Sequence, residues 1–254
     1  MLIGDDPHLT SLLVAQAASP EHELAVHFAP FLKFDLREPF LPIAVGYTVI
    51  RQSGPSPSFP RTIEVGRGEQ VLEYAIWWDW DIVHLYELEH IWIYLDSSER
   101  PIRAEASWHG SYRSMGVNGA LPLSGDRLVL YSEPGKHAFA PSPGWYQEGE
   151  KMNRWLCCEG AGIGGVLVTE LFSELIDTKS TQADKLVQDF LRSYAFVPTH
   201  EFDRTLQLPS EQMIPWPELF RWIPERVSYQ VEGLQDSVRS NPDLIEPLEC
   251  EGVP

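Results

Sequence analysis

Residues 74–96 read YAIWWDWDIVHLYELEHIWIYLD, a stretch that combines strand-forming side chains with carboxylates and imidazoles. Residues 91–95 are aromatic and β-branched, so we predict a β-strand here, in which residues two apart share a face. Glu87 and Glu89 therefore point the same way. Two neighbouring carboxylates repel each other unless a cation lies between them or one takes up a proton. The stretch therefore predicts a metal site on a β-sheet.

The residues around this pair supply the other candidate ligands, because a bend upstream of the strand can turn them toward the same ion. Asp79 can replace one ligand or orient it, whereas His90 falls on the opposite strand face with Leu88 and is interpreted as a packed histidine. Oxygen donors favour Mg²⁺, Ca²⁺ or Mn²⁺, with Zn²⁺ also open. The alternative is a solvated acidic strand face without a metal. The predicted metal ligands are Asp81, His84, Glu87 and Glu89.

Two histidines outside this stretch are candidate proton carriers. In the predicted strand at residues 102–107 and its continuation, Ser107 and His109 share a polar face. If this face looks toward the metal, His109 can act as general base or acid toward a metal-bound water, because imidazole titrates near neutral pH. The alternative is a polar face exposed to solvent. His137, which follows Gly135, is the second candidate, at a turn beside the site.

Composition limits the partners of the chain. Its 254 residues carry 19 Lys and Arg against 37 Asp and Glu, a formal net charge of −18, which disfavours nucleic acid. No apolar run reaches the roughly 18–20 residues that span a bilayer. Residues 9–18 lack the basic flank of a secretory signal and are predicted to form a short helix, so we expect a soluble, cytoplasmic protein. The three cysteines, Cys157, Cys158 and Cys250, define no disulfide framework, and the oligomeric state stays open.

The fold class is indicated by turn-forming residues that recur along the chain. From residue 31 to about residue 168, short strand-like runs alternate with Gly, Pro, Asn and Ser, which is typical of antiparallel sheets. We predict a mainly β protein, an antiparallel β-sandwich with peripheral helices and a helical C-terminal region. The strongest predicted strands are residues 44–51, 61–65, 70–78, 91–95, 102–107 and 128–132.

The C-terminal third differs in character from the rest. Helical spacing predicts helices at residues 181–194 and 218–231. We expect one domain over residues 1–254, with its core at about 24–170. The expected additions to that core are a helical appendage at 171–239 and a mobile tail at 240–254.

Several motifs resemble those of a known superfamily. Tyr74-Ala75, Asp81 and His84-x-x-Glu87-x-Glu89 resemble the centre of the NPP1-type necrosis-inducing proteins, with Glu87 where that family has Asp. The continuation into His90-Ile91-Trp92 resembles the related Vps62-like proteins, with Leu88 where they have Trp. Three further segments occur in the order of that superfamily, so that the matched part runs from Leu24 to Gly165. They are residues 24–42, the strand at 106–112, and 131–139, where Lys136 replaces the Ser of a Gly-Ser-His-Ala segment.

The resemblance implies a β-sandwich that holds a divalent cation, and NPP1-type toxins recognise head-group sugars of sphingolipids near their cation. Two functions are open. The first is a metal-dependent enzyme, most simply a hydrolase of unknown substrate, in which the cation lowers the pKa of a bound water and His109 or His137 moves the proton. The second is a cation-dependent binding protein for a glycan or a lipid head group, with a tryptophan at the rim that stacks on a sugar ring.

Overall fold

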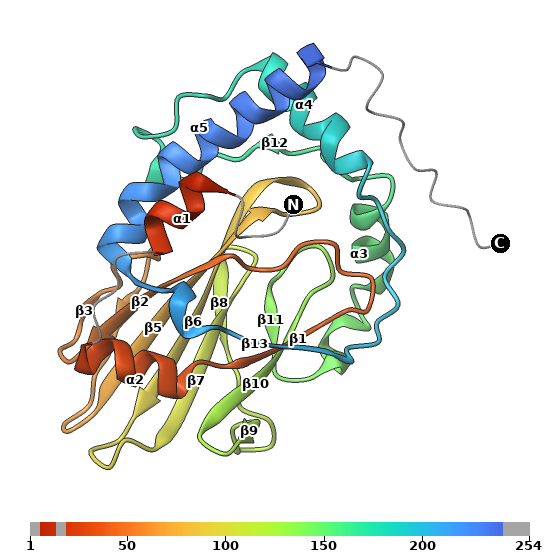
Figure 1. The fold of residues 1–254 in the computed structure, drawn as a ribbon. Coiled ribbons are helices and arrows are strands. Elements are labelled where there is room, and N and C mark those ends of the chain that lie inside the picture. Colours follow the sequence, from red (N-terminus) through yellow and green to blue (C-terminus); the bar gives the residue numbers. More distant parts are fainter. Residues whose placement is uncertain (1–5, 14–18, 241–254) are drawn as a thin grey trace.

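The structure is a computed structural model that describes residues 6–13 and 19–240. Two β-sheets share one hydrophobic core and helices lie around them, which confirms the predicted sandwich with peripheral helices (Figure 1). The predicted N-terminal helix is present as α1 (Pro7–Leu13), and its remaining residues 14–18 lie outside the described part, as do residues 241–254 of the predicted tail. Among the described residues, none of the helices is long and apolar enough to cross a membrane.

The larger sheet carries the site and has the strand order β14-β2-β5-β6-β7-β8, with β12 also paired to β6. The central pairs β2–β5, β5–β6, β6–β7 and β7–β8 are antiparallel, whereas β14–β2 and β12–β6 are parallel. The strands predicted at 44–51, 70–78, 91–95 and 102–107 are confirmed. The strands are β2 (Ala44–Ile50), β5 (Gln70–Trp80), β6 (His84–Leu95), β7 (Pro101–Trp108), β8 (Ser111–Ser114), β12 (Gly165–Val166) and β14 (Met213–Pro215).

The smaller sheet has the order β11-β10-β1-β13, with β9 on β10, and its β1–β10 pair is parallel. The strand predicted at 128–132 is β10, and the one predicted at 61–65 is reduced to β4, which pairs with β3 in a short hairpin. These strands are β1 (Phe31–Phe34), β3 (Gly54–Pro55), β4 (Thr62–Ile63), β9 (Leu123–Ser124), β10 (Arg127–Ser132), β11 (Phe139–Ala140) and β13 (Arg204–Gln207).

The region predicted as a helical appendage also builds both sheets. Strand β13 runs antiparallel to β1, and β14 runs parallel to β2. Strands of three or four residues are too short to show a periodic pattern, so the sequence did not reveal them.

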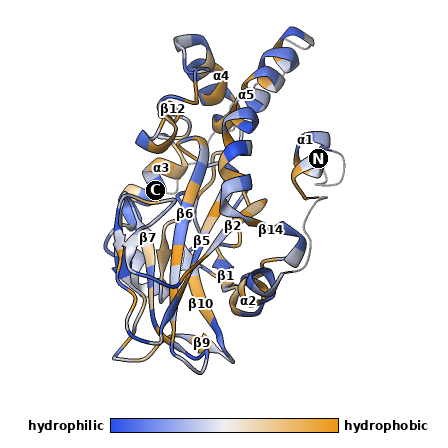
Figure 2. Ribbon diagram, turned by 90° about the vertical axis from the view of Figure 1, so that its left-hand side faces the viewer, coloured by the Kyte–Doolittle hydropathy of each residue, from blue (hydrophilic) through white to orange (hydrophobic). Residues whose placement is uncertain are grey.

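Helices cover the larger sheet on one side and at one end. Both views place α4 and much of α5 beyond one end of the sheets, and Figure 2 shows α2 beside the strands. Helix α5 packs closely on β2 because Gly46 lacks a side chain: a Cβ there would lie 2.8 Å from the ring of Trp216. The helices predicted at 181–194 and 218–231 are confirmed as α4 and α5. The helices are α2 (Pro20–Phe28), α3 (Glu150–Cys157), α4 (Thr181–Arg192) and α5 (Trp216–Ser240), with short 3₁₀ turns η2 (Pro143–Tyr146), η3 (Glu170–Phe172) and η4 (Ser210–Gln212).

Strand β6 is buried on both faces. Ile91 and Ile93 belong to the main core, whereas Trp92 and Tyr94 belong to a second apolar cluster under the β3–β4 hairpin. A strand covered on both sides has apolar residues in succession rather than in alternation. Polar residues at its beginning, from His84 onward, are therefore held in a largely buried setting.

Candidate functional site

The bend that joins β5 to β6 is fixed by Asp81, whose side chain is fully buried. Its Oδ1 accepts a hydrogen bond from the amide of Val83 at 2.7 Å, and its own amide donates to the carbonyl oxygen of His84 at 3.0 Å. An Asp that bonds the backbone two residues ahead is a common way to stabilise a turn. The bend places the other carboxylate oxygen, Oδ2, beside the first residues of β6.

His84 is oriented by the backbone of its own strand. Its Nδ1 lies 2.8 Å from the carbonyl oxygen of Tyr86, where only an N–H can form a hydrogen bond. Tyr86 adopts a positive φ of 56°, the left-handed conformation, at this point. A neutral His84 therefore presents its Nε2 as an acceptor, 3.8 Å from Asp81 Oδ1 and 3.7 Å from Glu87 Oε2.

Three of the four predicted ligands come together in this way. Asp81, His84 and Glu87 each offer one ligand atom, and these atoms lie within 4.8 Å of one another, a spacing that a metal ion can bridge. We call these three residues the acceptor cluster. The fourth predicted ligand, Glu89, does not belong to it.

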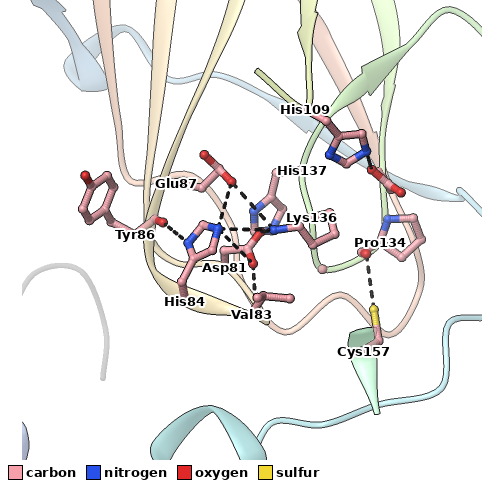
Figure 3. Close-up of polar contacts among 12 residues, drawn as sticks. Asp81, Val83, His84, Tyr86, Glu87, His109, Pro134, Lys136, His137 and Cys157 are labelled. Carbon is pink, nitrogen blue, oxygen red and sulfur yellow. Dashed lines mark hydrogen bonds and ion pairs between the residues drawn. The ribbon is translucent and has the colours of Figure 1, made fainter. Parts of the chain in front are cut away.

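A basic side chain that the sequence had not marked as a site residue occupies the acceptor cluster. The Nζ of Lys136 lies 2.7 Å from Asp81 Oδ2, 3.4 Å from His84 Nε2 and 4.0 Å from Glu87 Oε2 (Figure 3). Burial lowers the pKa of Lys136, but the charges of Asp81 and Glu87 outweigh this effect and leave the pKa raised. The ammonium group is therefore held in its charged form.

With Lys136 in place, the acceptor cluster does not fit a divalent cation. Both carboxylate oxygens of Asp81 already accept hydrogen bonds, one from Lys136 and one from Val83. The ammonium group donates a hydrogen bond to Asp81, lies 3.4 Å from His84 Nε2, and forms a longer ion pair with Glu87. A divalent ion at the same point would meet the positive charge of Lys136 at close range.

Glu87 and Glu89 share a strand face, as the sequence predicted. The pairing of β5 with β6 sets Glu87 opposite Trp78 and Glu89 opposite Ile76, so both carboxylates point toward the smaller sheet. His90 lies on the other face, where its ring stacks on Trp92 with the ring centroids 5.6 Å apart. The interpretation of His90 as a packed histidine is confirmed by these contacts.

Glu89 is buried at the point where β7 leaves β6. Its Oε2 accepts a hydrogen bond from the hydroxyl of Ser107. Burial raises the pKa of Glu89 well above its usual value, and the neighbouring charge of Glu87 raises it further. The raised pKa favours the protonated form of Glu89, which is one of the two ways of relieving the repulsion between the carboxylates that the sequence allowed.

The two predicted proton carriers are both engaged. His109 Nε2 lies 2.8 Å from Glu133 Oε2, and this hydrogen bond raises the pKa of His109. His137 is fully buried: its ring stacks on Trp78 with centroids 4.6 Å apart, and its Nε2 lies 3.3 Å from Glu38 Oε1. Figure 3 shows His109 apart from the acceptor cluster. Their proton-carrying roles stay predictions.

Asp79, the alternative ligand, belongs to a separate cluster. Arg226 of α5 holds it through two hydrogen bonds, Nε to Oδ1 at 3.0 Å and an Nη to Oδ2 at 2.6 Å, and the amide of Gln230 adds a third at 2.7 Å. Arg226 also bonds Asp6 Oδ2 at 2.6 Å. We call Arg226, Asp79, Asp6 and Gln230 the helix clamp.

A pocket borders the part of β6 that is paired with β5 on one edge but with no described strand on the other. The β6–β7 ladder ends at the pair Ile91–Ala106, and β12 pairs only with His84 and Leu85. The intervening edge borders a pocket of about 280 Å³, which we call the edge pocket. Its lining includes Ser58, Phe59, Pro60, Tyr86, Glu87, Leu88, Glu89, His90, Ser107, Gly110, Thr169, Glu170 and Leu171.

One indirect signal of Lys136 was present in the sequence, its substitution for Ser in the segment at 131–139. It gave none of Arg226, whose partner Asp79 lies 147 residues away. Glu133, the partner of His109, was likewise not singled out.

No family model matches this chain, and no curated protein does. Similar solved structures include NLPPya in complex with mannosamine and NLPPya in complex with glucosamine. Each is 21% identical, covers 50% of this chain and 70% of that chain, and has a TM-score of 0.35. Necrosis and Ethylene inducing Protein 2 from the causal agent of cocoa's Witches Broom disease is 17% identical, covers 50% of this chain and 69% of that chain, and has a TM-score of 0.33. These neighbours are NPP1-like, so the resemblance seen in the sequence is confirmed as a partial, divergent match.

Proposed function

We propose that this chain is a binding protein for small glycans and that its ligand carries an ammonium group, as an amino sugar does. One observation carries the proposal: the edge pocket, of about 280 Å³, combines apolar walls with several carboxylates. Ligand pockets are typically concave and apolar, with a few polar groups that set orientation.

The charge of the edge pocket favours a cationic ligand. Two of its lining glutamates, Glu87 and Glu170, supply the negative charge, whereas the third, Glu89, has a raised pKa, and none of the lining residues is a lysine or an arginine. The chain as a whole has a formal net charge of −18, which attracts cations over a longer range. The same charges repel a phosphate, so phospholipid head groups are disfavoured and an amine-bearing sugar is preferred.

The walls of the edge pocket suit the flat, apolar face of a sugar ring. Phe59, Pro60 and Leu171 lie beside the carboxylates, and Phe59 is partly exposed. Aromatic side chains at pocket rims bind well to ligands that have an apolar face and a polar edge. This rim role falls to a phenylalanine rather than to one of the tryptophans that the sequence suggested.

Calorimetric titration of the full chain tests the proposal. Glucosamine is the first probe, since it joins a pyranose ring to an amine and is bound in one of the similar structures. Glucose and N-acetylglucosamine are the comparisons without a charge. We expect saturable binding of glucosamine that is roughly tenfold tighter than that of glucose, the value of one charge-assisted hydrogen bond.

The variant Glu170→Gln should weaken binding of glucosamine but leave glucose unaffected. Glu174→Gln is the matched control, because Glu174 is an exposed glutamate on the same segment that does not line the edge pocket. Equal affinity for glucose and glucosamine would show that the ammonium group is not recognised. The absence of saturable binding for all three sugars would contradict the proposal as a whole.

A metal-assisted hydrolase, the first hypothesis from the sequence, has less support from the geometry. The acceptor cluster that would hold the ion contains Lys136, and the candidate proton carriers His109 and His137 are paired with Glu133 and Glu38. If the chain hydrolyses a generic ester or glycoside substrate only when Mn²⁺ is added, the hydrolase function is favoured over the binding function.

A further inference from the structure

We propose that the ammonium group of Lys136 is the resident cation of the acceptor cluster, so that this chain binds no divalent ion there. The three acceptor atoms of Asp81, His84 and Glu87 surround its Nζ at 2.7, 3.4 and 4.0 Å. A side chain thus supplies the positive charge for which the carboxylates predicted a metal. This inference does not rest on the glycan ligand, because it concerns atoms that face Lys136.

The backbone around Lys136 is fixed before it and after it, so the lysine is not a surface side chain that happened to fold inward. Gly135 has a positive φ of 67°, and a Cβ there would lie 2.7 Å from Ile82 and 2.9 Å from the sulfur of Cys157. Its amide donates to Glu38 Oε2 at 2.7 Å, and its carbonyl oxygen accepts from Ile82 at 2.9 Å. Only glycine fits this position, which ties the loop to the bend that carries Asp81.

The residue after Lys136 is equally constrained. His137 has a positive φ of 64°, its amide donates to the carbonyl oxygen of Glu133 at 2.8 Å, and its ring is stacked on Trp78. Cys157 of α3 closes the loop from below by donating its thiol to the carbonyl oxygen of Pro134 (Figure 3). The Cα of Lys136 is therefore held between two anchored neighbours, and its side chain reaches the acceptor cluster from a preset position.

Because Lys136 and Asp81 are buried, the position beside Asp81 holds either the lysine or a divalent ion, but not both. Lys136 is 8% exposed and Asp81 is fully buried, so removal of the lysine would leave a buried carboxylate without its counter-charge. A divalent ion could bind Asp81 Oδ2 only if Nζ moved away from it, because the two atoms are 2.7 Å apart. The ion and the lysine therefore compete for one position.

Binding of Mn²⁺ to the full chain, freed of metal with EDTA, tests the inference. We expect that wild type takes up no Mn²⁺ that depends on Asp81, and that its melting temperature is the same in EDTA and in Mn²⁺. The variant Lys136→Ala vacates the position and should gain one Mn²⁺. Its melting temperature should rise by roughly 5 °C when the ion is at about 100 times its dissociation constant.

Two further variants make the gain specific. Lys136→Ala combined with Glu87→Gln should lose the gained Mn²⁺, and Lys151→Ala, which removes an exposed lysine, should gain none. The inference is overturned if wild type binds one Mn²⁺ that Asp81→Asn abolishes, or if folded Lys136→Ala binds none. Should Lys136→Ala fail to fold, the comparison of wild type with Asp81→Asn decides the matter alone.

Discussion

Asp79 and Asp81 lie two residues apart at the end of β5, and the chain neutralises them in two different ways. In the helix clamp, the guanidinium fork of Arg226 bonds both oxygens of Asp79 and also reaches Asp6. In the acceptor cluster, Lys136 makes one close bond to Asp81 and leaves His84 and Glu87 at longer distances. Arginine saturates its partners through fixed planar geometry, whereas lysine acts as a point charge.

The difference indicates what each cluster does. The helix clamp joins α1, β5 and α5, and every acceptor oxygen of Asp79 has a donor within the protein, although its four residues also line a pocket of about 630 Å³. The acceptor cluster borders the edge pocket through Glu87, whose Oε2 lies 4.0 Å from the ammonium group of Lys136. Four experiments test this difference between the two clusters.

The largest effect is expected from Arg226→Met in the helix clamp. This change leaves Asp79 and Asp6 without a counter-charge, and breaking one side of a buried ion pair costs about 3–5 kcal/mol. Urea unfolding measures the loss. Arg239→Met is the control, since Arg239 pairs with Asp236 at the exposed surface and its loss should leave the unfolding midpoint unchanged. A loss below about 1 kcal/mol for Arg226→Met would show that the helix clamp does not hold α5 in place.

A double-mutant cycle on Lys136 and Asp81, measured in EDTA, tests the acceptor cluster. Lys136→Met alone should cost about 3 kcal/mol because it leaves Asp81 charged and buried. Adding Asp81→Asn removes that charge. The double variant should therefore lose about 1–2 kcal/mol less free energy of unfolding than the two single variants lose together. Additive losses would mean that the lysine and the aspartate do not act as a pair.

His90 lies outside both clusters, but it contributes to the loss of stability in acid. This contribution must be known before the stabilities of variants in the two clusters are compared at low pH. Burial lowers the pKa of His90 to about 3, against an ordinary value of 6.5. The unfolded chain therefore binds a proton at higher pH than the folded chain, so stability falls as the pH drops below about 6.5 and continues to fall toward about 3. We expect wild type to lose about 2 kcal/mol more than His90→Gln between pH 7 and about pH 5. Parallel unfolding curves for the two proteins over that range would contradict this.

The smallest effect is expected from Gln230→Ala. The amide of Gln230 gives Asp79 an additional hydrogen bond of 2.7 Å, but Arg226 still bonds both oxygens. The loss should be about 0.5–1.5 kcal/mol, the net value of one hydrogen bond. A loss as large as that of Arg226→Met would show that the helix clamp depends on the amide and that the arginine does not saturate Asp79.

Local features of the fold could be predicted from the sequence, and long-range ones could not. The strand at β6, the bend before it and the shared face of Glu87 and Glu89 follow from neighbouring residues and the alternation of a strand. The partners of the two aspartates could not be foreseen, because Lys136 comes from 55 residues away and Arg226 from 147. The carboxylates predicted a divalent cation, and the fold places the ammonium group of Lys136 beside Asp81, which no local pattern indicated.

Strands β13 and β14 are synthesised long after the strands with which they pair, and this delay affects folding during translation. Each covers a strand near the N-terminus: β13 pairs with β1 at the end of one sheet, and β14 pairs with β2 at the end of the other. Until residues 204–207 and 213–215 have been synthesised, the edges of β1 and β2 that these strands cover stay open. Open edges are templates for pairing between molecules. A chain cut after residue 170 would therefore expose the longer strand β2 and the strand β1 at these edges, and we expect it to aggregate more readily than the full sequence.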